Sequence, residues 1–373
     1  MNAFTRSGRR MIRLFRNPKV DQLLKIYHRA GGAMRQAAFD NLGLHHTHWR
    51  IVDPENLTTY TSLDLQTPWQ LELAAKAPPA LLKKRSLHLL DATWHFHSID
   101  LSTYKALFER VARTTPLAKF VIIARTPFCA YRLGQAGIGA IQANSSAFED
   151  DRAWSIEEPP SGGAPRYEAI YNARLLDWKN HHLTKALKNQ LFVYEHPGQD
   201  SDLVHGFRKD FPNACFANHD LNDGIYRYFD EKDLSRLLAD AHVSLALSFK
   251  EGFMRASLQS LLAGKPVVTV ENIGGRSRFY HDDTALFVAP TPEAVKAGVH
   301  VLKERRLSPE FVRREAMKLL QIERRDVMES INGIRGDVFG PTARTLDFEA
   351  FRGIKFRRAP VLDFWQALEQ AVG

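Results

Sequence analysis

Residues 248–275 read SFKEGFMRASLQSLLAGKPVVTVENIGG, and this stretch decides the fold. Apolar residues recur in it with the period of a helix, at Met254, Leu258, Leu261 and Leu262. Gly264 stands where that helix should end, and Pro266 prevents its continuation. The order strand, loop, short helix, strand is the repeating unit of an α/β protein with a parallel sheet.

The loop before the helix has the composition of a ligand site. Gly252 lets a backbone approach a ligand closely, and the N–H groups at the helix start are free to bind an anion. Glu251 suits sugar hydroxyls better than phosphate, although it could also act only as a charge partner of the helix N-terminus. The combination suggests a nucleotide-sugar site.

The same residues resemble the donor-site signature of family 4 glycosyltransferases, which have the two-lobed GT-B fold. That signature is Glu-Gly-Phe, a second Glu eight residues after the first, a small residue with Gly-x-Pro-Val-Val, and a Gly-Gly loop. Residues 251–253, 263–268 and 274–275 match it in order and spacing, but Gln259 stands in place of the second Glu. The resemblance covers roughly residues 23–305 and is strong over 170–290.

This resemblance implies an α/β protein of GT-B fold: two Rossmann-like lobes with parallel sheets face a central cleft, and a C-terminal helix crosses back to the first lobe. The clearest linker is EEPPSGGAP at 157–165, and alternating strands and helices precede and follow it. We therefore expect a basic N-terminal extension (1–22), an acceptor-side lobe (23–160), a donor-side lobe (166–345) and a crossover segment on the first lobe (346–373).

Several elements follow from the local pattern. In the first lobe we predict strands at 23–27, 47–52, 87–96, 120–124 and 139–144, with helices at 33–42 and 102–114. Residues 53–85 read as irregular. In the second lobe we predict strands at 167–172, 191–194, 242–247 and 285–288 and helices at 231–240, 292–305 and 309–331, then a glycine-rich connection (332–350) and a last helix (363–372).

Two cations come after the first strand of the second lobe, Arg174 and Lys179. Their spacing resembles the family's Gly-Arg-x-x-x-x-Lys segment, whose Arg and Lys hold the donor diphosphate; Ala173 replaces the glycine here. Two cations at this place would neutralise the charge that develops on a departing diphosphate. Without the downstream signature, such a pair would be ordinary solvated surface.

The resemblance assigns four further donor-site roles. Glu251 would accept hydrogen bonds from the donor sugar, which makes it a candidate catalytic residue, and the backbone of Gly252 and Phe253 would approach the donor. Gln259 would take the place of the glutamate that binds ribose, and an amide accepts that bond more weakly than a carboxylate.

The first lobe offers histidine and glycine candidates. His95 and His97 share one face of a predicted strand end, where the family often has a histidine beside the transferred sugar, so both are candidate catalytic residues. Buried or surface histidines are the alternative. Gly31 and Gly32 resemble the loop that faces the cleft in GT-B enzymes and are donor-binding candidates or a plain turn.

Other charged residues are weaker candidates. Arg125 follows a predicted strand near the cleft, and Arg276 and Arg278 follow the Gly-Gly loop, where they would lie beside the donor or acceptor or in solvent. The acidic run 149–151 resembles a metal site only superficially. We expect no metal and no cofactor beyond the nucleotide sugar, which is a co-substrate.

The formal net charge of +9 is concentrated at one end. Residues 1–50 hold ten Lys and Arg against Asp21 and Asp40. Such a tail suits an anionic membrane surface or simple solvation. Two cysteines and the lack of a long apolar window favour a cytoplasmic protein, with peripheral contact at the inner face of the plasma membrane as an option.

These observations predict a glycosyltransferase that moves a sugar from a nucleotide-diphosphate donor to an acceptor hydroxyl. The family resemblance implies that the transfer retains the anomeric configuration and needs no metal. A glycan or lipid-linked acceptor in bacterial envelope or lipopolysaccharide synthesis suits the basic tail. One alternative is a non-catalytic or epimerising GT-B protein that binds a sugar nucleotide, which Gln259 keeps open. A glycosyltransferase acting on nucleic acid is the other, but it is not favoured because the charge is confined to a tail.

Overall fold

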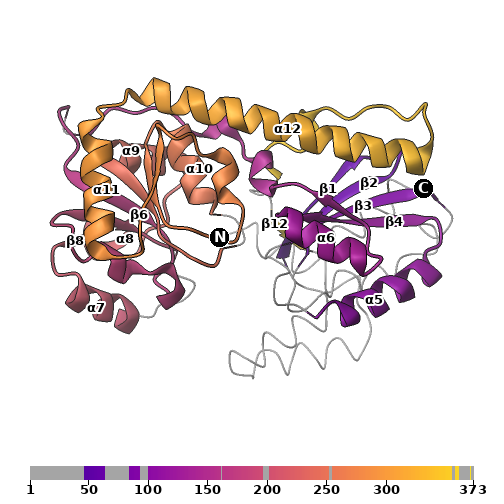
Figure 1. Cartoon of the computed structure of the whole chain (residues 1–373), viewed down its shortest axis with the longest axis horizontal. Coiled ribbons are helices and arrows are strands. Elements are labelled where there is room, and N and C mark those ends of the chain that lie inside the picture. The colour runs from indigo at the N-terminus through magenta and orange to yellow at the C-terminus, as the bar shows by residue number, and fades with distance from the viewer. Residues whose placement is uncertain are drawn as a thin grey trace, which may run out of the picture.

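The computed structural model describes residues 46–63, 84–92, 100–160, 162–195, 201–251, 254–354, 358–360 and 370. They form two six-stranded sheets with helices around them, side by side along the long axis of the molecule (Figure 1). The predicted strand 23–27, helix 33–42 and most of the last helix, 363–372, lie outside these residues. No helix in the described part is long and apolar enough to cross a membrane.

The first sheet has the strand order β12-β1-β2-β3-β4-β5. Strands β2 to β5 run parallel, whereas β1 pairs antiparallel with both β2 and β12. The connecting helices after β3 and β4 are α5 (Leu101–Thr114) and α6 (Pro127–Gln135). The strands are β1 (His46–Asp53), β2 (Thr58–Leu63), β3 (Ser86–Ala92), β4 (Ala118–Ala124), β5 (Ala140–Gln142) and β12 (Arg358–Pro360).

The β1–β2 hairpin corrects the prediction that residues 53–85 are irregular. Asp53 Oδ1 accepts hydrogen bonds from the backbone N–H of Glu55 (3.0 Å) and Asn56 (3.3 Å), which closes the turn. The residues after this turn, TTYTSL, are rich in β-branched and aromatic side chains and form β2. The antiparallel pairing of β1 with β2 therefore comes from a local turn that the nearby prolines concealed.

The second sheet is wholly parallel, in the order β11-β10-β9-β6-β7-β8. This is the order of a doubly wound dinucleotide-binding fold, with the reversal between β6 and β9. Ligands of such sheets bind in the crevice outside the carboxyl ends of the strands at that reversal. The strands are β6 (Tyr167–Asn172), β7 (Gln190–Val193), β8 (Ala214–Phe216), β9 (Ala241–Ala246), β10 (Val267–Thr269) and β11 (Ala285–Phe287).

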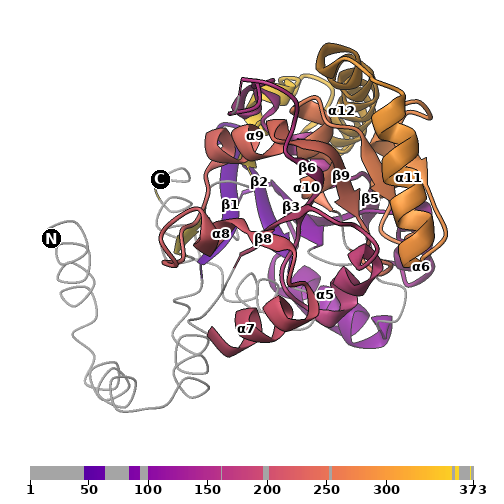
Figure 2. The same ribbon diagram turned by 90° about the vertical axis from the view of Figure 1, so that its left-hand side faces the viewer.

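Helices cover both faces of the second sheet, with α11 on one side and α9 on the other (Figure 2). The α10 helix lies on the α9 side, where Leu258 and Leu262 join the same apolar cluster as Leu237 and Leu238 of α9. The helices are α7 (Ser201–Asp210), α8 (Ala217–Asp220), α9 (Glu231–Ala239), α10 (Arg255–Leu262) and α11 (Pro292–Glu304).

One long helix, α12 (Pro309–Phe339), runs across both lobes (Figure 1). Its first half contacts α10, and in its second half Val327 and Ile331 pack into the core of the first sheet. The predicted helix 309–331 therefore continues for eight more residues. Gly333 and Gly336 do not end it, because Arg335 is buried against the first lobe and its Nη2 lies 2.5 Å from Asp53 Oδ2. In the described chain, the crossing from the second lobe back to the first is made by α12.

Candidate functional site

The carboxyl ends of β6 and β9 form a crevice that three sequence-predicted residues line. Arg174 and Lys179 come after β6, and Glu251 comes after β9. All three border one cavity of about 340 Å³. Because β6 and β9 are the neighbours at which the strand order reverses, this cavity lies where doubly wound sheets bind their ligands.

Lys179 and Glu251 form a buried ion pair in this cavity. The distance from Lys179 Nζ to Glu251 Oε2 is 2.6 Å, and each residue is only 7% exposed. Burial lowers the pKa of Lys179, and the attraction of Glu251 opposes that shift. The ammonium also lies 4.2 Å from the centre of the Trp178 ring. The pair places one cation and one carboxylate side by side in a cavity where both are largely shielded from solvent.

The backbone around Lys179 is fixed by its neighbours. Residues Asp177–Lys179 form a short 3₁₀ turn that ends at Asn180, whose φ of 58° is left-handed. The Asn180 amide donates to Leu247 O at 2.9 Å, and the Tyr171 hydroxyl donates to Lys179 O at 2.5 Å. The first bond ties the loop after β6 to the end of β9, and the second ties it back to β6, so the Lys179 side chain is held toward Glu251.

Arg174 lies at the rim of the cavity and pairs with Glu195, which follows β7. The Arg174 Nη2 to Glu195 Oε2 distance is 2.7 Å, and the side chains are 46% and 50% exposed. An exposed pair of this kind contributes little to stability, so Arg174 can exchange Glu195 for an anionic ligand at small cost. Sequence reasoning missed Glu195, although its place directly after a predicted strand was a usable signal.

A second cavity, of about 730 Å³, adjoins the first and shares Asn172, Glu195, Arg255 and Ala256 with it. Its wall combines the aromatic side chains of Tyr194, Tyr228 and Phe229 with the polar Asn218 and Gln259. Aromatic side chains beside several convergent polar groups are found in many small-molecule sites. Gln259 therefore lines a cavity next to the one that holds Glu251.

The Gln259 side chain is bound to Glu149, a residue of the connection between the two sheets. Gln259 Nε2 donates to Glu149 Oε1 at 3.1 Å, and Glu149 is 1% exposed. The same carboxylate accepts from Trp154 Nε1 at 3.0 Å and from Arg255 Nε at 2.8 Å. Glu149 thus binds two side chains of helix α10, Arg255 and Gln259.

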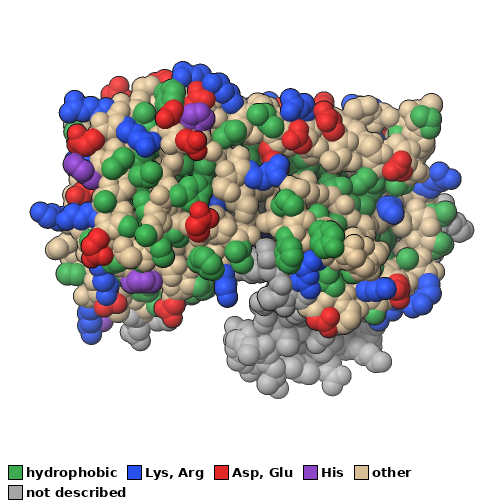
Figure 3. All heavy atoms as spheres, in the orientation of Figure 1, with side chains coloured by type: hydrophobic (Ala, Val, Ile, Leu, Met, Phe, Trp, Pro, Cys, Tyr) green, Lys and Arg blue, Asp and Glu red, His purple; other side chains and the backbone are tan. Residues whose placement is uncertain are grey.

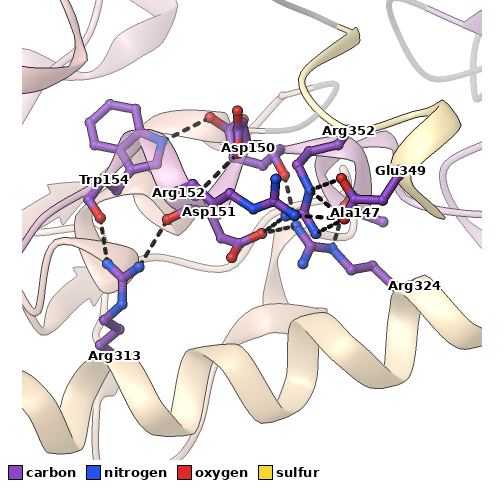
Figure 4. Close-up of polar contacts among 10 residues, drawn as sticks. Ala147, Asp150, Asp151, Arg152, Trp154, Arg313, Arg324, Glu349 and Arg352 are labelled. Atoms are coloured by element: carbon purple, nitrogen blue, oxygen red, sulfur yellow. Dashed lines mark hydrogen bonds and ion pairs between the residues drawn. The ribbon is translucent and has the colours of Figure 1, made fainter.

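The connection between the two sheets, which contains Glu149, is bound to α12 by arginine side chains (Figure 4). Arg313 donates to the backbone oxygens of Trp154 (2.7 Å) and Asp151 (2.9 Å). Arg324 donates to the backbone oxygens of Ala147 and Glu149, and it also pairs with the Asp151 carboxylate. Across the described ranges, no three His, Cys, Asp or Glu side chains gather closely enough to hold a metal ion.

Arg125, after β4, is buried below the cleft in the first lobe. Its Nη2 lies 3.9 Å from Asp91 Oδ1, and Tyr60 donates a hydrogen bond to the same carboxylate. Burial lowers the pKa of Arg125 to about 9, while the negative charge of Glu251 in the other lobe raises it. Arg125 is therefore a buried cation whose nearest ion-pair partner is Asp91.

The Gly-Gly loop contacts the first lobe directly. Gly275 has a φ of 80°, and a Cβ there would lie 3.1 Å from the Arg125 carbonyl oxygen. Asn144 Nδ2 donates to Gly275 O at 3.1 Å. The glycine is needed for both the backbone conformation and the close approach of the lobes.

Arg276 is buried, so it lies neither beside a ligand nor in solvent as predicted, whereas Arg278 lies at the surface, which is one of the two alternatives considered for it. Arg276 is 2% exposed, and its guanidinium donates to the backbone oxygens of Ala246, Ser248 and Val270 at 2.7–2.8 Å. It fastens the loop to β9 and β10 and has no free face for a donor. Arg278 Nε donates to Glu323 Oε2 of α12 at 2.6 Å. Arg276 is therefore a structural cation, and Arg278 is a surface cation that joins the loop to α12.

The remaining predicted site residues lie outside the described residues: Gly31, Gly32, His95, His97, Gly252 and Phe253. Their assignments stay predictions.

No protein-family model matches this sequence, and no curated protein matches it in sequence. Similar solved structures exist at low identity. HepE from Anabaena, solved in complex with UDP, is 14% identical, and the alignment covers 73% of this chain and 78% of HepE with a TM-score of 0.50. OtsA without ligand is 12% identical, with 87% and 78% covered and a TM-score of 0.51.

A further OtsA structure, described as trehalose-6-phosphate synthase, is 11% identical over 76% of this chain and 72% of that one, with a TM-score of 0.50. Likeness at this level shows the fold. Together with the two sheets and the crossing helix, it shows that this chain has the GT-B fold.

Proposed function

We propose that this protein is a glycosyltransferase that moves a sugar from a nucleoside-diphosphate donor to an acceptor hydroxyl. The observation that carries the proposal is the buried Lys179–Glu251 pair, with Arg174 in the same cavity, at the strand-order reversal of the second sheet. HepE, of the same fold, binds UDP according to the description of its structure. The donor-site resemblance around Glu251 supports membership of family 4.

The groups in the two cavities suit a bound donor. Arg174 and Lys179 would hold the diphosphate and stabilise its charge as it departs. Glu251 would accept hydrogen bonds from the sugar, and Gln259 would accept one from the ribose in the adjoining cavity. The bond between the anomeric carbon and the phosphate oxygen breaks, the acceptor oxygen bonds to that carbon, and the departing phosphate takes the acceptor proton.

This course retains the anomeric configuration and requires neither a metal ion nor a separate general base. The backbone of Gly252 and Phe253 would approach the donor, and Gly31 and Gly32 would face it across the cleft. His95 and His97 would lie beside the transferred sugar. We assign the donor to the lobe at 166–345 and the acceptor to the lobe at 23–160, with 346–373 packing back on the latter.

We infer the chemical class of the acceptor from the distribution of charged residues. On the face drawn in Figure 3, acidic and basic side chains are intermingled over both lobes, which does not suit a nucleic-acid surface. The basic excess of residues 1–50 suits an anionic, glycan or lipid-linked acceptor at the inner face of a plasma membrane. Envelope glycan or lipopolysaccharide synthesis is the setting that we propose. A GT-B protein that binds or epimerises its ligand is the alternative that Gln259 favours.

A thermal-shift screen with UDP-, GDP-, ADP- and CMP-sugars tests the proposal. We expect one nucleotide to raise the melting temperature, and Glu251→Gln and Arg174→Ala to reduce that rise. Glu304→Gln, at an exposed position of α11, is the control and should behave as wild type. Release of free nucleoside diphosphate from the stabilising donor then separates transfer from mere binding. Repeating that measurement with a chelator tests whether a metal ion is required. No shift with any donor would refute the proposal.

A further inference from the structure

We propose that Glu149 is a positioning residue for nucleotide binding: it orients Gln259 and Arg255 on α10, and Gln259 is the residue that this contact requires. The inference rests on the proposed function and adds a residue to it from outside the donor lobe. It also reverses the simplest interpretation of Gln259, namely that a ligand-binding glutamate has been lost.

The bonding of Glu149 is the first step. Its Oε1 accepts from Trp154 Nε1 and Gln259 Nε2, and its Oε2 accepts from Arg255 Nε. A carboxylate that is only 1% exposed needs hydrogen bonds and a neighbouring cation to compensate for its lost hydration. Arg255 supplies the cation. Glu149 is thus fully engaged within the protein and acts on a ligand only through its partners.

Helix geometry is the second step. Arg255 and Gln259 are four residues apart on α10, so they project from one face of the helix. That face borders the 730 Å³ cavity, which both residues line. Arg255 also lines the smaller cavity with Arg174 and Lys179. A donor that spans both cavities would therefore carry its diphosphate past Arg255 and its ribose past Gln259.

The orientation of the Gln259 amide is the third step. Because its nitrogen donates to Glu149, its carbonyl oxygen is the atom that can accept a hydrogen bond from a ligand. A glutamate at position 259 would instead bring a second carboxylate to the buried Glu149. Two like charges this close cannot both stay ionised without a large penalty, so one would be protonated or displaced.

The position of Glu149 itself is the fourth step. Arg324 of α12 donates to the Glu149 backbone oxygen at 2.7 Å, and Arg313 of the same helix holds the backbone oxygens of Asp151 and Trp154 (Figure 4). The segment that joins the lobes is thereby fixed against α12. Because its backbone is fixed, the Glu149 carboxylate holds Arg255 and Gln259 in place at the wall of the 730 Å³ cavity.

A charge-swap series tests the inference, with calorimetric binding of UDP, ADP and GDP and the tightest of the three used throughout. We expect Gln259→Glu to weaken binding by roughly tenfold, and Glu149→Gln to weaken it similarly. The defect of Gln259→Glu should shrink as the pH falls from about 8 to about 5.5, because protonation relieves the repulsion.

The double variant Glu149→Gln/Gln259→Glu rebuilds an amide–carboxylate contact with the partners exchanged. We expect it to bind within about threefold of wild type, better than either single variant. Gln321→Glu and Glu304→Gln make the same chemical changes at exposed sites and should leave binding unaltered. Circular dichroism and thermal unfolding identify any variant that fails to fold.

The outcomes separate the two proposals. If wild type binds no nucleoside diphosphate, the proposed function fails and this inference fails with it. If wild type binds and Gln259→Glu binds equally well or better, only the inference is overturned. The same holds if the double variant regains wild-type unfolding stability but not binding, because Glu149 would then serve the fold alone.

Discussion

Lys179 Nζ lies 2.6 Å from Glu251 Oε2 although the two residues are 72 positions apart in the sequence. The pair joins the loop after β6 to the loop after β9, at the reversal of the strand order. In a buried pair, each charge depends on the other for compensation. The contact therefore serves the fold as well as the proposed donor site.

Removing one member of this pair should destabilise the protein strongly. Lys179→Met leaves the Glu251 carboxylate buried without its cation, and we expect a loss of about 3–5 kcal/mol in the free energy of unfolding. The double variant Lys179→Met/Glu251→Met removes both charges and should lie closer to wild type. Denaturant unfolding measures both, and strictly additive single-variant losses would contradict the coupling.

Arg174→Ala should separate binding from stability. The Arg174–Glu195 pair is about half exposed, so we expect the free energy of unfolding to change by less than about 1 kcal/mol. Loss of a cation from the diphosphate site should still weaken nucleotide binding by roughly tenfold or more. Calorimetry and denaturant unfolding on the same sample provide the comparison. A variant that binds as well as wild type would remove Arg174 from the site.

The sequence was sufficient to predict most of the second lobe. Residues 167–172 were predicted as a strand and form β6 with those bounds, and the helix predicted at 292–305 is α11, one residue shorter. Short buried apolar runs between turn residues define these elements locally. Arg174, Lys179 and Glu251 were brought together in prediction by the resemblance to family 4 donor-site segments, and the structure shows that the strands they follow, β6 and β9, are neighbours.

The features that could not be predicted from the sequence depend on tertiary contacts. The helix predicted to end at residue 331 continues to Phe339, because Ile331 and Arg335 are buried against the first lobe. The Glu149–Gln259 bond spans 110 positions, and nothing in the local sequence marks it. Arg276 was interpreted as a ligand-binding or solvated cation because a pattern of residues does not show which guanidinium is buried.

Gly264→Ala should be among the more damaging single changes in the second lobe. Gly264 has a φ of 80°, and a Cβ there would lie 2.6 Å from the Cβ of Pro309, at the start of α12. The left-handed conformation alone costs an alanine about 1–2 kcal/mol, and the clash adds to it. Gly333→Ala, inside α12 with open space around it, should instead raise stability by about 1 kcal/mol. Thermal unfolding of the two variants should shift in opposite directions.

Arg276→Met should destabilise the protein through unsatisfied backbone groups. It removes the donors from the carbonyl oxygens of Ala246, Ser248 and Val270, and we expect a loss of about 3 kcal/mol or more. Arg305 also donates to backbone carbonyls, but at an exposed site, so Arg305→Met should cost less than about 1 kcal/mol. Equal losses in denaturant unfolding would show that burial of Arg276 does not matter.

His181→Phe should make the fold less sensitive to acid. The His181 ring packs between Tyr171, Phe192 and Phe207, and neither ring nitrogen has a hydrogen-bond partner among the described atoms. Burial lowers its pKa to about 3, and the nearby Lys179 acts in the same direction. An unfolded histidine titrates near 6.5, so between pH 6.5 and about 3 the unfolded state binds more protons, and stability falls with falling pH.

The contribution of His181 to this fall is at most about 1.4 kcal/mol per pH unit. Phenylalanine carries no proton in either state, so the stability difference between pH 7 and about pH 5 should shrink by up to about 2 kcal/mol in His181→Phe. At pH 7 the variant should be as stable as wild type or more so, since an apolar ring replaces unpaired nitrogens among aromatic neighbours. His300→Phe, at an exposed position of α11, should keep the wild-type difference. Denaturant unfolding at the two pH values decides: an undiminished difference in His181→Phe would mean that this ring is not the source of the acid sensitivity.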